Sequence, residues 1–78
     1  EPITAHVVGG TLRTFTTPTS LDQLSLGTVI SVGGVEHMRT GYSRGSWTDC
    51  LGNACSHYKM FRRMLEDADK CEIIHMGN

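Results

Sequence analysis

The sequence has no hydrophobic run long enough to cross a membrane, and neither sign of charge is in excess. Seven lysines and arginines face eight aspartates and glutamates, which gives a formal net charge of −1. A dedicated DNA-binding domain usually carries a basic excess, and a disordered acidic tail carries a run of carboxylates. Both classes are therefore disfavoured, and we expect no membrane partner.

Cysteine is also scarce, with only Cys50, Cys55 and Cys71 in the chain. An odd number of cysteines fits a reducing compartment better than a disulfide scaffold. We therefore expect free thiols and a cytoplasmic protein. A disulfide between Cys50 and Cys55 is the alternative in an oxidising compartment.

A chain of 78 residues predicts a single domain over residues 1–78, with a small core. Two Gly-Gly pairs organise its first half. Gly33-Gly34 separates the β-branched segments 28–32 and 35–40, and Gly9-Gly10 separates the segments 4–8 and 11–16. Two-residue hairpin turns favour positive φ, which glycine adopts without strain, so each pair predicts a β-hairpin.

One helix is predicted over residues 54–69, capped by Asn53 or Ser56. Its apolar positions recur at helical spacing, with Met64 beside them, and predict a buried face of Tyr58, Phe61, Leu65 and Ala68. Residues 71–76 then have a β-branched centre and predict a final strand. Pairing in the middle of the sheet would bury Ile73 and Ile74 on opposite faces.

These elements predict an α+β, two-layer domain. We expect an antiparallel or mixed sheet of four or five strands, with one C-terminal α-helix packed on one face and a final β-strand. Trp47, the only tryptophan, is expected in the core with Val29. The strand at 4–8 is expected at an edge of the sheet.

The segment 20–30 reads Ser-Leu-Asp-Gln-Leu-Ser-Leu-Gly-Thr-Val-Ile, and it is followed by Arg39-Thr40-Gly41 and Trp47. From Thr16 to Trp47 the chain resembles a hairpin module of small proteins of actinobacterial phages, mycobacteriophages especially. It departs from that module at Ser25, where proline is usual, and in a longer loop at 42–45. The module occurs in proteins of unrelated roles. The resemblance therefore implies a phage source and the cytoplasm of an infected bacterium, but no catalytic residues.

Soft metal ligands occur in two groups, Cys50, Cys55 and His57 before the helix and Cys71 with His75 after it. Their spacing does not match the close pairs of structural zinc sites, and a helix of the predicted length separates the groups by about 24 Å. Cys50, His57 and Asp49 could form a nucleophilic set on paper, but no glycine-rich oxyanion motif accompanies them. We expect no metal, no cofactor and no enzymatic activity.

Methionine and aromatic residues are numerous for so small a chain and suit contact with a protein partner. We therefore expect a non-enzymatic accessory protein that binds a host protein or a second copy of itself. The candidate partner-binding residues are Met38, Arg39, Tyr42, Arg44, Met60, Arg63 and Met64. The alternative is a nucleic-acid-binding regulator that uses the Arg39/Arg44 turn and the Arg62/Arg63 helix face.

Overall fold

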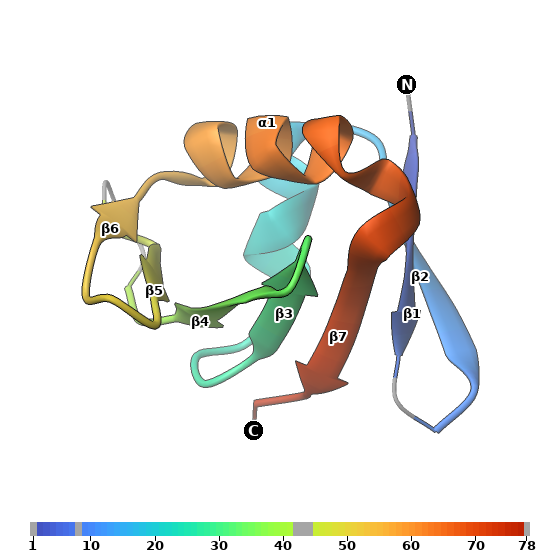
Figure 1. The fold of residues 1–78 in the computed structure, drawn as a ribbon, viewed down its shortest axis with the longest axis horizontal. Helices are drawn as coiled ribbons and strands as arrows, with labels where there is room; N and C mark the ends of the chain where they lie inside the picture. Colours follow the sequence, from blue (N-terminus) through green and yellow to red (C-terminus); the bar gives the residue numbers. More distant parts are fainter. Residues whose placement is uncertain (1, 8, 42–44, 78) are drawn as a thin grey trace.

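The computed structural model describes residues 2–7, 9–41 and 45–77. Six strands precede one α-helix and a seventh strand follows it (Figure 1). One short 3₁₀-helix lies between the second and third strands, and another lies between the α-helix and the last strand. No helix in the described ranges is long and apolar enough to cross a membrane. The bounds are β1 Ile3–Val7, β2 Thr11–Phe15, η1 Pro18–Gln23, β3 Val29–Val32, β4 Val35–Arg39, β5 Trp47–Asp49, β6 Ala54–Cys55, α1 His57–Glu66, η2 Ala68–Lys70 and β7 Cys71–His75.

All seven strands form one mixed sheet in the order β2-β1-β7-β3-β4-β5-β6. The α+β class is confirmed, but the sheet is larger than the predicted four or five strands. It is larger because the last strand, β7, lies between β1 and β3 and joins the two hairpins into one sheet. The two-residue strand β6, which was predicted as helix, then extends the far edge. Within the described ranges, β1 and β7 form the one parallel pair.

The two Gly-Gly hairpins are confirmed. In the second, Val32 pairs with Val35 across Gly33 and Gly34, whose φ angles are +57° and +87°. Side chains with a Cβ are strained in this region, so the turn depends on both glycines. The predicted strand at 4–8 is not an edge, because β2 covers one side of β1 and β7 covers the other. The sheet ends instead at β2 and β6.

The α-helix is shorter than predicted. Ser56 caps it, and the Ser56 hydroxyl accepts a hydrogen bond from the backbone N–H of Lys59. The residues before the cap form β6, because Cys55 pairs with Trp47 instead of continuing the helix backwards. At the other end the chain leaves the helix at Asp67 and makes the 3₁₀ turn η2 before entering β7.

The predicted phase of the helix was also partly wrong. Phe61 is buried as expected, together with Met60 and Met64. Tyr58 is 61% exposed and Leu65 42% exposed, and Ala68 lies outside the helix on the surface. The aromatic ring of Tyr58 lies instead on the outer side, beneath the Arg62 guanidinium. Two methionines therefore fill the core where the periodicity placed a tyrosine and a leucine.

The core lies between α1, η1 and one face of the sheet. Trp47 and Ile73 are fully buried there, as predicted, whereas Ile74 is half-buried. Val29 is only half-buried, because it alternates with Ile30 and points to the opposite face of the sheet. Helix α1 covers one face of the sheet only (Figure 1). We call the other face, which no described element covers, the open face.

A pair of alanine substitutions tests this helix phase. Phe61→Ala should cost about 3–5 kcal/mol of unfolding free energy, because a buried aromatic ring is lost. Tyr58→Ala should cost no more than about 0.5 kcal/mol, because that ring is largely in solvent. Urea titrations followed by circular dichroism measure both. An equal loss in the two variants would contradict the observed helix phase.

Candidate functional site

Arg39 is the most deeply buried charged residue described, with a side chain only 1% exposed. Its Nη1 donates to the carbonyl of Asp22 at 3.0 Å and to the carbonyl of Leu24. Its Nε donates to the carbonyl of Gly41 at 3.3 Å, and its Nη2 donates to Asp22 Oδ1 at 2.8 Å. One buried cation thus donates hydrogen bonds to backbone carbonyls at the end of η1 and just after the end of β4. Through this hydrogen bond and its charge, Arg39 lowers the pKa of Asp22.

His57 continues this network into the core. Its Nδ1 accepts a hydrogen bond from the Trp47 indole N–H at 2.9 Å, so a neutral ring carries its proton on Nε2. Nε2 is buried and lies 3.5 Å from Asp22 Oδ1, which is beyond good hydrogen-bond length. Burial, with the nearby Arg39 charge, lowers the pKa of His57. Protonation at Nδ1 would break the contact with Trp47.

His37 forms a second cluster under the other end of the helix. Its Nδ1 donates to the carbonyl of Val35 at 2.9 Å, which leaves Nε2 to accept from Arg63 Nη1 at 3.3 Å. Arg63 Nη1 also reaches Cys55 Sγ at 3.8 Å. Burial, with the Arg63 charge, lowers the pKa of His37. These side chains join β4, β6 and α1.

Three of the five predicted partner-binding residues that the structure describes are buried. Met60 and Met64 are fully buried, and Arg39 is engaged in the network above, so none of the three offers a contact surface. For Met60 and Met64 the sequence does not separate the two environments, because methionine at helical spacing suits both a core and an interface. Arg63 is half-buried against His37. Met38 is exposed, and Tyr42 and Arg44 lie outside the described residues.

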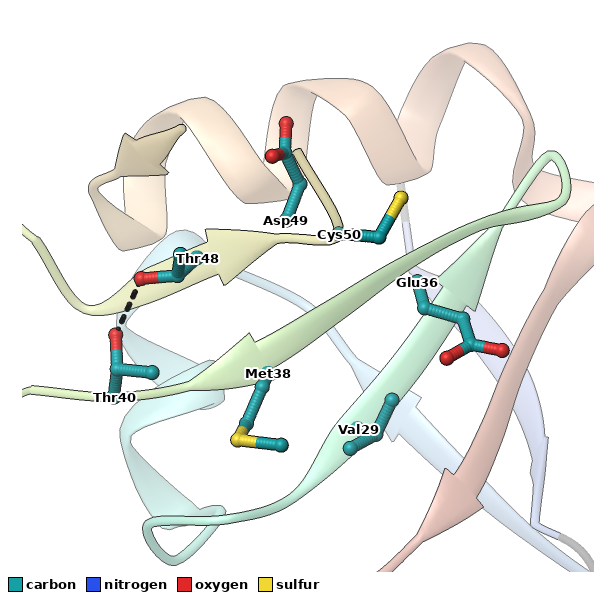
Figure 2. A pocket seen from close by; sticks show the side chains of 7 residues that line it. All are labelled: Val29, Glu36, Met38, Thr40, Thr48, Asp49 and Cys50. Atoms are coloured by element: carbon teal, nitrogen blue, oxygen red, sulfur yellow. Dashed lines mark hydrogen bonds between the residues drawn. The ribbon is translucent and has the colours of Figure 1, made fainter. Parts of the chain in front are cut away.

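The structure adds a hollow of about 230 Å³ on the open face, around Met38. Its floor is apolar, because Val29 and Met38 are cross-strand partners. The Thr40 and Thr48 hydroxyls, 2.7 Å apart, close one end, and Glu36 lies at the other (Figure 2). Cys50 lines it as well, whereas the Asp49 side chain points towards the helix. The period-two alternation of 29–31 and 36–38 was the sequence signal for this shared face.

A second hollow, of about 360 Å³, lies on the outer side of the helix. The Arg62 guanidinium lies 5.9 Å from the centre of the Tyr58 ring, which is cation–π geometry. Lys59 and Arg63 add positive charge, and Glu66 reduces it. Arg62 and Arg63 therefore do share a hollow, as the nucleic-acid alternative requires.

The cysteines fall into separate environments. Cys50 is exposed, Cys55 is buried beside Arg63, and Cys71 is buried at the far end of α1, where its thiol contacts the carbonyls of Met64 and Asp67. Burial raises the pKa of Cys71 to about 11. Among the described residues, no group of three or more His, Cys, Asp and Glu side chains is arranged to hold a metal ion.

No family model matches this chain, and no curated protein and no solved structure was found to be similar to it.

The two buried histidines predict a loss of stability in mild acid. Both have pKa values lowered from the ordinary 6.5, so the unfolded chain takes up protons at a higher pH than the folded one. Their contribution is fully present above about pH 6.5 and is lost as the pH falls through the folded pKa values. The urea concentration at the midpoint of unfolding should therefore decrease as the pH is lowered from about 7.5 to about 5.

His57→Gln should weaken this pH dependence, and His6→Gln, a substitution at an exposed histidine outside both clusters, is the matched control. A midpoint that stays constant or rises as the solution is acidified would contradict the assignment of both rings as neutral in the folded protein.

Proposed function

We propose that this protein is a small, non-enzymatic accessory protein that acts by binding another protein through the open face of its sheet. The phage resemblance between Thr16 and Trp47 supports a host protein as the partner and the cytoplasm of an infected bacterium as the place of action. A second copy of the chain is the other protein partner that the same surface would suit.

The observation that carries this proposal is the uncovered hollow around Met38. A sheet normally covers an apolar face against another layer, and here only one face is covered. On the other, Met38 is 46% exposed beside a half-buried Val29. Methionine is flexible and polarizable, so it adapts to the shape of a partner side chain. A concave apolar floor with a polar rim is the usual form of a contact site.

The reactive side chains near the core have structural roles, which supports a binding function over catalysis. His57 accepts from Trp47, and His37 bonds to Val35 and Arg63. Asp49 Oδ1 accepts from the backbone N–H groups of Leu51 and Asn53, so this carboxylate holds the β5–β6 turn.

A nucleic-acid regulator is the second candidate, favoured by the Arg62–Tyr58 pair in the outer hollow. An arginine stacked on an aromatic ring is a common means of contacting bases and phosphates. Arg39 no longer supports it, because its guanidinium is buried and bonded to backbone carbonyls. Among the described residues this candidate therefore depends on the helix face, and Arg44 of the predicted turn lies outside them.

The test places a negative charge on the open face in one variant and on the outer side of α1 in another. The purified protein is immobilised and exposed to lysate of an actinobacterial host, and retained proteins are identified by mass spectrometry. Met38→Glu should abolish retention of a partner, because it puts a carboxylate on the apolar floor. Tyr58→Glu, on the helix side, is the matched control and should retain the same partner as the unmodified protein.

The second candidate is tested on the same variants by fluorescence anisotropy with a labelled DNA duplex. Binding that falls steeply with salt, is lost in Arg62→Glu and persists in Met38→Glu would replace the protein-binding proposal with the nucleic-acid one. Retention that is equal in Met38→Glu and the unmodified protein would also refute the assigned surface.

A further inference from the structure

Two carboxylates lie in one row across the open face. Ser31 on β3 pairs with Glu36 on β4 and with Glu72 on β7, so the three residues share a face of adjacent strands. The two flanking strands are about 10 Å apart, twice the spacing of neighbouring strands. Both glutamates are exposed, and the small Ser31 side chain lies between them.

Neither carboxylate is neutralised from within the described part of the chain. The ion pair among the described residues joins Asp22 to Arg39, and the neutral His57 ring lies 3.5 Å from the same carboxylate. His6 on β1 pairs with Glu72 on this face, but the described lysine and arginine side chains lie elsewhere. Arg13 pairs with the buried Ala5 and so shares the helix-side face, and Lys70 lies in η2 at the end of the sheet. The other cations are Arg39 in the core and Lys59, Arg62 and Arg63 on α1.

The apolar groups of the open face run beside this acidic pair. Val29 and Met38 form the floor of the hollow on one side of Ser31, with Glu36 at its end (Figure 2). Ile74 follows Glu72 on β7 and is half-buried. The surface thus offers a carboxylate on each side of Ser31 and, next to Ser31, the apolar pair of Val29 and Met38, with His75 as the other cross-strand neighbour of Val29.

We infer that the open face binds an amphipathic helix whose apolar stripe is flanked on both sides by lysine or arginine. This inference rests on the proposed protein-binding function and names the chemistry of its partner. The exposed face of a sheet is covered in folded domains by a helix or a second sheet, whereas an added strand needs a sheet edge. A helix is about 10–12 Å wide, which matches the separation of the strands that carry the two glutamates. Basic residues on its flanks would meet both carboxylates while its stripe covers Val29 and Met38.

The probe is a synthetic amphipathic peptide of about 18 residues, long enough to form a helix, with a leucine stripe flanked by lysines. A second peptide carries glutamate in place of every lysine. Binding to the full chain is measured by isothermal titration calorimetry at low salt, and the contact surface is mapped by amide chemical-shift changes. The lysine peptide should bind and shift the amides of Ser31 and Met38, and the glutamate peptide should bind at least ten-fold more weakly.

Charge reversal decides the matter. The double variant Glu36→Lys, Glu72→Lys should lose at least ten-fold in affinity for the lysine peptide and gain affinity for the glutamate peptide. Glu66→Lys, a reversal on the helix side, should change neither. Circular dichroism melts verify that each variant is folded. Higher salt should weaken binding of the lysine peptide to the unmodified protein, because exposed charge pairs are screened.

Equal binding of both peptides, shifts confined to helix α1, or the same loss in Glu66→Lys would overturn the inference. Self-association of the chain through this face would also overturn it. Analytical ultracentrifugation would then show a dimer that is lost in the double variant Glu36→Lys, Glu72→Lys. If the lysine peptide fails while Met38→Glu still abolishes retention of a protein partner, the basic helix is wrong and the protein-binding function stands. If Met38→Glu also has no effect, both proposals fail.

Discussion

The buried guanidinium of Arg39 is the constraint on which the rest of this structure depends. A cation out of water costs several kcal/mol unless its donors are satisfied, and here they bond to three backbone carbonyls and to Asp22. Those partners belong to η1, to the residue that follows η1 and to the segment that follows β4. Through Asp22 and His57 the same network reaches the indole of Trp47 at the centre of the core. The position of the helical layer over the sheet is therefore tied to one side chain.

Local patterns predicted the local structure well and the long-range pairing poorly. The Gly33-Gly34 turn was readable because positive φ has a clear residue preference. The seven-strand sheet was not, because strand β6 has only two residues and depends on Cys55 pairing with Trp47. The role of Arg39 was missed for a related reason. An arginine in a strand usually faces solvent, and only the tertiary fold brings the Asp22 and Leu24 carbonyls to its guanidinium.

The candidate site, too, could be predicted only in part from the local sequence. Methionine suits cores and interfaces alike, so composition alone could not separate the exposed Met38 from the buried Met60 and Met64. The alternation of strands β3 and β4 does separate them, because it sends Ile30 and His37 to the core and Val29 and Met38 to the open face. The buried polar network stabilises one side of the sheet, and the apolar hollow is left on the other. This division underlies the proposed binding function.

The most direct test of this account compares the unfolding free energies of Arg39→Met and Asp22→Asn by urea titration. Arg39→Met should lose about 2–4 kcal/mol, because three carbonyls lose their donor and the cluster around η1 loses its link to β4. Asp22→Asn should cost clearly less, because the Asp22 side chain is 67% exposed and the carbonyl contacts of Arg39 remain. Stability of Arg39→Met equal to or above that of the unmodified protein would contradict the central role assigned to the buried guanidinium.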